Sequence, residues 1–392
     1  MVFFCAFTAA EQGVQWFTAM TDIRILPVSG SRDMKQFVTL PARLYRGTPW
    51  VPPIWADERR GYSAESNPVL ENSDFTLLLA WRDGAPAGRI LAYVDRSWNE
   101  HFSADDGLFG ALDAVDDPAV YRALLDAAAA FLAARGARRM LGPIHPVAEF
   151  WGTLVRGFDT PPVFLTPWNP PAADGLIREA GFDKEMDLLA YQADVPGGYR
   201  LPDRYRDFYR RFLARRPAFT LRSLDMSRFL EDAGHIWRIT DLSLINNWGY
   251  VPVPRDVFLD MVRRLKLIVD PEAICFVEKD GVPVGYALGY PDINIILKAI
   301  RGRLFPLGWL ILLYRRRRLK HYRLFGLGVL REFHGMGLDA LMYVHLAKSM
   351  ERRGIRLEAN WILENNLPMN NALVRLGLKV IKRYRLYSRV IA

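Results

Sequence analysis

The segment 326–350 reads GLGVLREFHGMGLDALMYVHLAKSM and contains the residues best suited to binding an anion. Its pattern predicts a strand ending near Arg331, a glycine turn and then a helix that ends at Gly354. Glycines at such a junction let backbone N–H groups surround an anion, and the helix N-terminus adds about half a positive charge. The expected binding residues are His334, Gly335, Met336, Gly337 and Leu338. A tight turn also requires glycine, so this motif alone is weak evidence.

The elements around this junction occur twice in the chain. DGAPAGRILAY (83–93) and DGVPVGYALGY (280–290) share six of eleven residues, and EAGFDKEMDLLAY (179–191) is echoed by RLGLKVIKRYRLY (375–387) at nearly the same offset. Two matches in the same order indicate a duplicated domain. Each copy predicts the order strand, strand, strand, helix, strand, helix, strand. This is an α/β fold with a mixed, twisted sheet flanked by helices.

We therefore expect two lobes, 21–195 and 205–392, joined by a Gly- and Pro-containing linker at 196–204. Residues 1–20 are expected to be disordered or to precede the true start, because Met20 opens a more ordinary beginning. In the first lobe the equivalent junction, FGALDAVDDPAVYRALL, has no Gly-x-Gly and carries two aspartates. Like charges repel phosphates, so we expect this lobe to be degenerate and only the second to bind a cofactor.

Composition narrows the classes of function. The chain has two cysteines, Cys5 and Cys275, which provide no disulfide framework and favour a reducing compartment. Its six histidines show no metal-binding spacing, so we expect no metal. No apolar run reaches the ~20 residues that span a bilayer, and the first residues lack the positive region of a signal peptide.

A strand, a glycine loop and a helix, followed by a strand and the segment NNLPMNNALVRLGL, resemble the GNAT acyltransferases. The resemblance covers residues ~270–392 well and ~75–195 more loosely. It implies that the loop binds the pyrophosphate of acyl-CoA, and that Asn366, 11 residues before Gly377, matches the family's asparagine. His334 stands where the family usually has Arg or Gln, Asp339 replaces a small residue, and Leu373 replaces the tyrosine that often protonates the thiolate.

The resemblance implies amide formation, which needs oxyanion donors, a base and an acid. We expect the donors to be backbone N–H groups near Val329 and Leu330. Period-2 alternation would put Glu358, Asn360 and Glu364 on one face of a strand, with the glutamates as candidate bases and Asn360 orienting them. Tyr384 or Tyr387 is the candidate acid. Structural alternatives stay open, because Glu364 could cap the next helix and the tyrosines could simply pack.

Further segments, including LPARLYRGTPWVPP, RGFDTPP and WILENN, resemble a bacterial two-lobe group of GNAT-like proteins that includes the bacterial ceramide synthases. Those enzymes join an acyl-CoA to the amine of a sphingoid base. The loop 144–167, with His145, Glu149 and Trp151, is expected to line the acceptor tunnel, or else to be a lid that only packs.

Nearly all of the net charge of +9 lies in residues 291–323, which contain nine Lys or Arg and one Asp. Comparison of the two repeats gives this segment ~19 extra residues, FPLGWLILLY with arginines on both sides. We expect a basic amphipathic insertion that lies on an anionic membrane surface. The expected contacts are Trp309, Arg315, Arg316, Arg317 and Arg318. A core helix with solvated basic ends is the alternative.

These features predict an acyl-CoA-dependent N-acyltransferase that acylates a long-chain lipid amine, in the bacterial cytoplasm and peripherally bound to the inner membrane. Two alternatives remain. One is an aminoacyl- or acetyltransferase with a polar acceptor, and the other is a non-catalytic membrane adaptor. We expect no nucleic-acid partner, because the basic residues flank Leu, Ile and Trp rather than isolated stacking aromatics.

Overall fold

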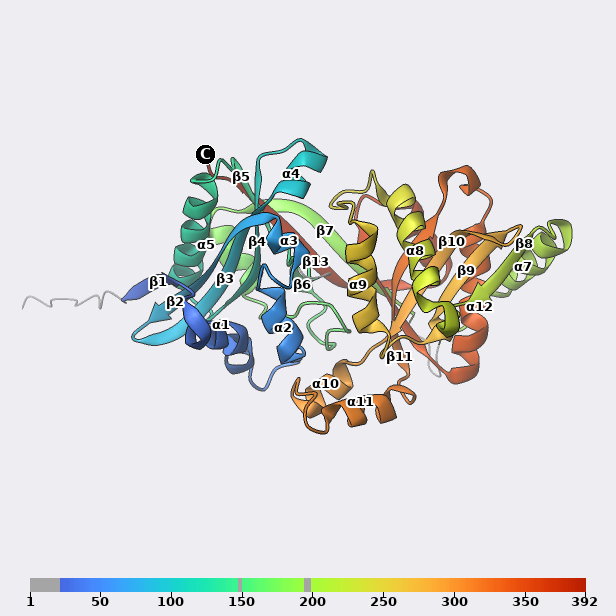
Figure 1. The fold of residues 1–392 in the computed structure, drawn as a ribbon, viewed down its shortest axis with the longest axis horizontal. Helices are drawn as coiled ribbons and strands as arrows, with labels where there is room; N and C mark the ends of the chain where they lie inside the picture. Colours follow the sequence, from blue (N-terminus) through green and yellow to red (C-terminus); the bar gives the residue numbers. More distant parts are fainter. Residues whose placement is uncertain (1–21, 147–149, 194–198) are drawn as a thin grey trace, which may run out of the picture.

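The computed structural model describes residues 22–146, 150–193 and 199–392. Within these residues the strands form one continuous 13-stranded sheet, in the order β1-β2-β3-β4-β5-β13-β7-β12-β11-β10-β9-β8, with β6 beside β13. Figure 1 shows two lobes along this sheet, which we call the N-lobe (22–193) and the C-lobe (199–392). The expected residues 1–20 and linker 196–204 fall wholly or partly outside the described residues.

The N-lobe contains β1 (Ile23–Pro27), α1 (Gly30–Leu44), α2 (Trp55–Gly61), α3 (Pro68–Glu71), β2 (Ser73–Arg82), β3 (Ala85–Asp95), α4 (Arg96–Phe102), β4 (Asp106–Ala114), α5 (Pro118–Ala133), β5 (Arg139–Gly142), β6 (Thr153–Arg156), α6 (Ala173–Glu179) and β7 (Asp183–Gln192). The C-lobe contains α7 (Asp203–Arg215), β8 (Phe219–Ser223), η1 (Met226–Arg228), α8 (Phe229–Leu244), α9 (Arg255–Leu265), η2 (Pro271–Ala273), β9 (Ile274–Lys279), β10 (Val282–Pro291), α10 (Asn294–Ile300), α11 (Gly308–Arg316), β11 (His321–Val329), η3 (Arg331–Phe333), α12 (Leu338–Arg353), β12 (Arg356–Leu363), α13 (Leu367–Arg375) and β13 (Lys379–Val390).

The α/β fold expected from the sequence is confirmed. The order β2, β3, β4, α5, β5, α6, β7 in the N-lobe recurs as β9, β10, β11, α12, β12, α13, β13 in the C-lobe. Both hairpins turn through an Asp-Gly pair with positive φ at both residues, Asp83 and Gly84 in one lobe and Asp280 and Gly281 in the other. This conformation matches the twist of the flanking strands, which explains why the same dipeptide occurs twice.

The two lobes exchange their last strands. Strand β7, the final strand of the N-lobe, pairs with β12 and β13 of the C-lobe. Strand β13, the final strand of the C-lobe, pairs with β5, β6 and β7 of the N-lobe. The hydrogen-bonded sheet therefore continues from one lobe into the other. The repeat in the sequence did not predict this exchange.

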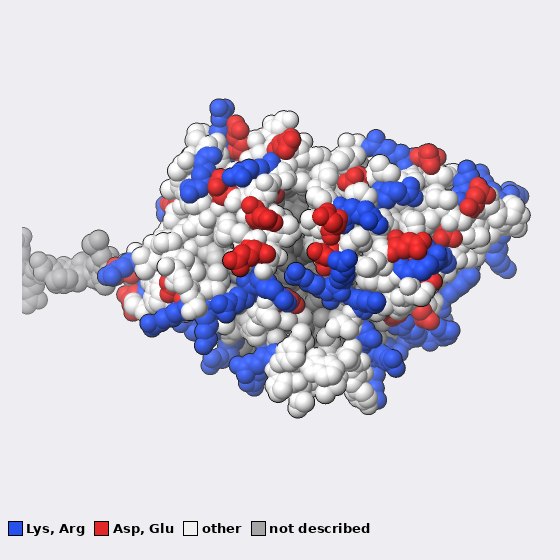
Figure 2. Space-filling view, in the orientation of Figure 1, with Lys and Arg blue, Asp and Glu red and all other residues white. Residues whose placement is uncertain are grey.

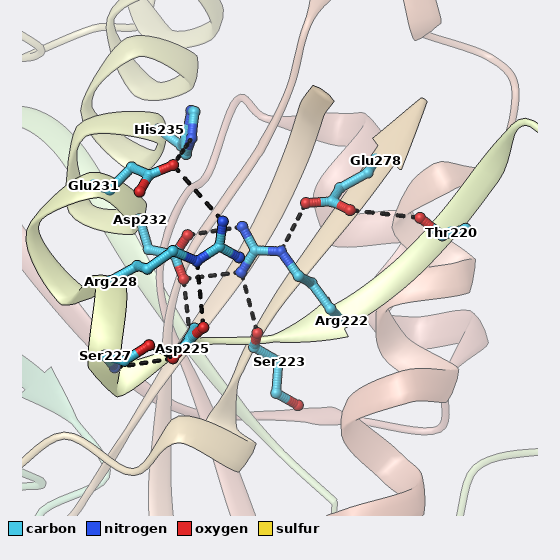
Figure 3. A network of polar contacts seen from close by, with 10 residues as sticks. All are labelled: Thr220, Arg222, Ser223, Asp225, Ser227, Arg228, Glu231, Asp232, His235 and Glu278. Carbon is cyan, nitrogen blue, oxygen red and sulfur yellow. Dashed lines mark hydrogen bonds and ion pairs between the residues drawn. The ribbon is translucent and has the colours of Figure 1, made fainter. Parts of the chain in front are cut away.

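The edge of the C-lobe sheet is held to α8 by an ionic network (Figure 3). Arg222 on β8 donates two hydrogen bonds, of 2.7 and 2.8 Å, to the buried carboxylate of Asp232 on α8, and a third of 2.6 Å to Glu278 on β9. Asp232 also accepts the backbone N–H of Asp225 at 2.9 Å. These contacts fix where α8 begins.

Candidate functional site

Strands β11 and β12 lie side by side over only part of their length. Their parallel ladder runs from His321–Arg356 to Leu324–Ala359 and then stops, although both strands continue. Beyond that point β12 keeps pairing with β7 on its other edge. Within the part of the chain that the structure describes, the edge of β11 over residues 325–329 is therefore left without a strand partner. Backbone groups on such an edge can hydrogen-bond an extended ligand as a further strand would.

A β-bulge lies where the two strands diverge. Leu324 and Gly326 of β11 pair with the consecutive residues Gly289 and Leu288 of β10, so Phe325 is the extra residue. A bulge bends its strand and redirects the neighbouring backbone groups, and bulges are common beside active sites. The sequence reasoning did not identify Phe325, and a single bulge leaves no reliable signal in a strand pattern.

The glycine turn expected from the sequence joins β11 to α12. Gly335 and Gly337 have φ of +76° and +78°, and Gly337 is the N-cap of α12. A Cβ on Gly337 would lie 2.7 Å from the ring of Phe208 on α7, whereas a Cβ on Gly335 would meet nothing within 4 Å. Gly337 is therefore required both by its conformation and by the close approach of Phe208.

The N-terminus of α12 has backbone donors that no side chain satisfies within the described residues. Gly337 has no side chain with which to cap the helix. In the N-lobe, by contrast, Asp117 caps the matching helix α5 and accepts from Ala119 N at 2.7 Å and from Val120 N at 3.3 Å. Uncapped N–H groups and the helix dipole make the start of α12 the better of the two sites for a phosphate.

Groups around the turn have specific partners. His334 Nε2 lies 2.8 Å from the carbonyl oxygen of Val329, and because a carbonyl only accepts, Nε2 carries the hydrogen. The Leu330 amide donates to Val284 O at 3.0 Å, so this expected oxyanion donor is already engaged. Asn366 accepts from Met369 N at 3.2 Å and caps α13. Burial, together with the charge of Asp339, raises the pKa of Tyr343 on α12 well above its usual value.

A fully buried chain of polar side chains lies beside the divergence of the two strands. Asn360 donates to Glu358 Oε1 at 2.8 Å, and Lys382 on β13 donates to Glu358 Oε2 at 2.9 Å. Arg323 on β11 donates to the side-chain oxygen of Asn360. Both oxygens of Glu358 are thus occupied, which suits a residue that positions its neighbours.

Of the other two candidates, Glu364 lies apart from this polar chain, whereas Tyr384 lies close to Glu358 and Arg323. The register of β12 against β7 shifts between Ala359 and Ile362, so the alternation does not carry through to Glu364. Glu364 lies beyond β12, where it pairs with Lys184 Nζ at 2.7 Å and accepts from Asp187 N at 3.1 Å. Burial, and then the charge of Glu358, raises the pKa of Tyr384 well above its usual value, so this hydroxyl stays protonated at neutral pH.

The loop at 157–168 of the N-lobe is attached to the C-lobe through its backbone. Lys382 donates to Pro161 O at 3.0 Å, and Arg323 donates to Phe164 O at 3.2 Å and to Leu165 O at 3.1 Å. Asn294, at the start of α10, donates to Pro162 O at 2.7 Å. This loop is therefore held against the polar chain beside β11 and β12, where it can form a wall of the site.

Residues of the expected acceptor loop lie in different surroundings. His145 is buried, with Nε2 2.9 Å from the hydroxyl of Tyr62. Trp151 packs against Gly249 in the connection between α8 and α9, where a Cβ would lie 2.8 Å from its ring. Glu149 lies outside the described residues. Figure 2 shows a hollow between the two lobes, with charged side chains around its rim.

The expected insertion forms two short helices, α10 and α11, below the sheet in Figure 1. Its apolar residues are divided between a small core and the surface. Ile293, Ile296, Leu297 and Leu312 are buried, while Trp309 is 42% exposed. Arg315, Arg317 and Arg318 are exposed and Arg316 is partly buried. The segment therefore has both buried and exposed apolar side chains, a division that the sequence did not reveal.

Sequence reasoning missed Arg323 and Lys382, the two cations of the polar chain. Each is a single charge within a strand, at HYRLFGLGV and KVIKRYRLY, and such residues usually face solvent. The described residues contain no group of three or more His, Cys, Asp or Glu side chains arranged to hold a metal ion. Among the described helices, none combines the length and apolarity required to cross a bilayer.

Comparison with known proteins agrees with this geometry. The model of the acetyltransferase (GNAT) family matches residues 236–378. Protein YghO of Escherichia coli K12 is 34% identical over 374 residues, which are 92% of this chain and 93% of that protein. Bacterial ceramide synthase of Caulobacter vibrioides is 31% identical over 380 residues, which are 94% and 98%.

Solved structures share the two-lobe fold. A tandem GNAT protein from the clavulanic acid biosynthesis pathway superposes with a TM-score of 0.55 at 12% identity, over 95% of this chain and 99% of that one. At this identity the likeness concerns the fold alone. The family assignment rests on the two sequence relatives, because each is more than 30% identical to this chain over almost its whole length. The chain therefore belongs to the GNAT family of N-acyltransferases, and it resembles the two-lobe group that includes bacterial ceramide synthase.

Proposed function

We propose that this protein transfers a long acyl chain from acyl-CoA to the amine of a sphingoid-type lipid base at a membrane surface. The observation that carries the proposal is the uncapped N-terminus of α12, which the glycine turn joins to β11, a strand whose edge at 325–329 has no strand partner within the described residues. The identity to bacterial ceramide synthase supports the choice of a lipid amine.

In this proposal the C-lobe holds the acyl-CoA. The pyrophosphate is bound by the backbone N–H groups of Gly335, Gly337 and Leu338, because those of His334 and Met336 already donate to Arg331 O and Phe333 O. The pantetheine arm lies along the unpaired edge of β11 and ends near Val329. The N-lobe binds no CoA, because Asp117 occupies the matching helix N-terminus with its own carboxylate.

The reaction forms an amide. The neutral amine attacks the thioester carbonyl carbon, the carbon–sulfur bond breaks, and the proton lost by the amine balances the charge of the leaving CoA thiolate. We assign Glu358 and Asn360 to positioning, because they hold Lys382 and Arg323 beside the loop at 157–168. Glu364, the other candidate base, fits positioning better than direct proton transfer because it is ion-paired with Lys184. Tyr384 stays the candidate acid, because it holds its proton at neutral pH.

The test is acyl transfer by purified protein in detergent, with radiolabelled palmitoyl-CoA and a panel of amines that includes sphinganine and 3-ketosphinganine. We expect labelled amide from the long-chain amines and none from the Gly337→Asp variant, whose carboxylate would repel the phosphates. Gly136→Asp controls for an aspartate at positive φ, because Gly136 also has positive φ but follows α5 in the N-lobe and, unlike Gly337, has open space around it. Gly335→Asp, at a position in the same turn with positive φ and open space, separates the effect of the charge from the clash with Phe208.

Two results would contradict the proposal. Transfer only to polar amines would favour an acetyl- or aminoacyltransferase. No transfer together with no binding of acyl-CoA by calorimetry would leave only the non-catalytic adaptor.

A further inference from the structure

The two lobes present one continuous surface that is apolar at its centre and basic around it. The centre is the insertion, where seven apolar side chains are exposed. They are Ile295, Phe305, Leu307, Trp309, Leu310, Ile311 and Tyr314, which we call the apolar platform. Phe305 is 80% exposed and Leu307 62%. An exposed apolar cluster of this size on a folded protein marks an interaction site.

Cations surround the platform, and within the described residues none of those at 298–318 forms an ion pair with a carboxylate. Arg301 and Arg303 precede α11, exposed Arg315 lies in its last turn, and exposed arginines at 317 and 318 follow it. Figure 2 shows the result as a white patch at the bottom of the molecule with blue side chains on both sides. This arrangement complements a surface that is apolar inside and negatively charged at its boundary.

A second basic feature lies on the N-lobe, in a groove between α1 and α2 with a volume of about 790 Å³. Four of the residues that line it are cations, namely Arg32, Lys35, Arg59 and Arg60. Arg60 pairs with Asp57, but within the described residues Arg32, Lys35 and Arg59 have no ion pair. The nearby Glu58 contacts Tyr62 and Arg89, so it does not neutralise the groove.

The groove is joined directly to the insertion. Trp55 lines the groove, and its Nε1 donates to Arg301 O in the turn between α10 and α11 at 2.8 Å. Gly302 in that turn has no space for a Cβ, because Pro53 O would lie 2.1 Å away. Lys298 donates to Thr48 O at 3.1 Å. These contacts fix the groove beside the platform, so the two can meet one extended partner.

We infer that the α1–α2 groove and the apolar platform together form a docking surface for an anionic lipid bilayer. The platform enters the boundary between headgroups and acyl chains, and the groove receives the phosphate of a lipid headgroup. Charge complementarity supports this partner, since unpaired cations lie on both sides of an apolar centre. The inference goes beyond the proposed acyl transfer, because it assigns a lipid-headgroup site to the lobe that does not hold CoA.

The first test is co-sedimentation with phosphatidylcholine vesicles that contain or lack phosphatidylglycerol. We expect binding that requires phosphatidylglycerol and weakens with salt. Removing one cation near such a surface weakens binding about fivefold, so Arg32→Gln with Lys35→Gln should weaken it about 25-fold. Arg211→Gln with Arg215→Gln is the matched control, because it removes two exposed cations of α7 and should change binding less than about twofold.

The second test concerns the platform. Phe305→Ser with Leu307→Ser should reduce vesicle binding without changing thermal stability, because both side chains are already largely exposed. Equal losses from the groove and control variants would overturn the headgroup site. Strong binding to neutral vesicles, stronger binding to RNA than to vesicles, or a dimer that the platform variant dissociates would overturn the bilayer as partner.

Failure of this inference and failure of the proposed function are distinguishable. Vesicle binding requires no catalysis, so it can succeed where acyl transfer fails. Conversely, calorimetric binding of palmitoyl-CoA by the Arg32→Gln, Lys35→Gln variant should equal that of the wild type, because neither residue lies in the C-lobe.

Discussion

Gly337 combines a left-handed backbone with close contact to an aromatic ring, and Gly335 offers a matched position without the contact. Left-handed φ costs a residue with a Cβ about 1–2 kcal/mol at either position. We expect Gly335→Ala to lose about that much stability. Gly337→Ala should lose more and bind acyl-CoA more weakly, because its methyl group would push Phe208 or the turn aside. Urea denaturation and calorimetry measure the two effects.

The ring of Phe208 provides the control. Gly337→Ala is expected to lose more stability than Gly335→Ala. Adding Phe208→Ala to Gly337→Ala should remove this extra loss, because the space that the ring fills becomes free. Non-recovery in the double variant would show that conformation alone, and not the contact with Phe208, makes glycine necessary.

The ion pair between Glu358 and Lys382 is fully buried, with N and O atoms 2.9 Å apart. Removing one partner leaves an uncompensated charge in the interior, which costs about 3–5 kcal/mol. We expect Lys382→Met to lower the free energy of unfolding by that amount. The double variant Glu358→Gln, Lys382→Met should recover much of it in urea denaturation. A loss below about 1 kcal/mol in the single variant would contradict burial of the pair.

Residues in the candidate site differ in how well the sequence reveals them. Gly335 and Gly337 could be predicted because a strand, a turn and a helix follow one another locally. Arg323 and Lys382 could not, because each is buried by residues distant in the chain, such as Pro161 and Phe164. The same limit applies to Glu364, since its partner Lys184 belongs to the other lobe.

At the scale of elements, Asp187 fixes the pairing of β7 with β13. Its buried carboxylate accepts from Arg385 Nε at 2.7 Å and from Arg383 at 2.7 Å. Burial alone would raise the pKa of Asp187, but the hydrogen bonds from the two arginines outweigh it and hold the pKa below the ordinary 3.8. The charged form is therefore the one that the folded protein stabilises.

We expect Asp187→Asn to lower the free energy of unfolding by about 3 kcal/mol at neutral pH. The stabilisation by Asp187 is complete above its unfolded pKa and is lost as the pH falls through the lower folded pKa. The difference between wild type and variant should therefore be constant near neutrality and shrink below about pH 4. Urea denaturation at several pH values measures it, and a difference that grows on acidification would contradict this assignment.

The elements themselves were largely predictable, and their partners were not. Asp-Gly turns, helix caps and alternating strands are local patterns, so both copies of the repeat could be read from them. Tertiary packing decides which strands β7 and β13 pair with, because each could satisfy the same local pattern within its own lobe. The repeat at 179–191 and 375–387 even favours that simpler arrangement.

At the scale of the whole molecule, the exchange makes each lobe dependent on the other. Residues 22–193 would contain β7 with neither of its neighbours, β12 and β13. Residues 199–392 would contain β13 with none of its three partners. Each fragment alone would thus expose the long edge of a strand, which promotes aggregation.

We therefore expect neither fragment to fold when expressed alone, and the two to co-purify as a folded complex when expressed together. The physical reason is that most hydrogen bonds of β7 and β13 lie between fragments and form only when both are present. Circular dichroism and gel filtration of each fragment and of the mixture provide the measurement. Replacing Asp187 by Asn should weaken the complex, whereas a variant remote from the exchange, such as Arg211→Gln, should not. A fragment that is monomeric and folded by itself would show that β7 and β13 also pair within their own lobes, and the continuous sheet would then be only one of two arrangements.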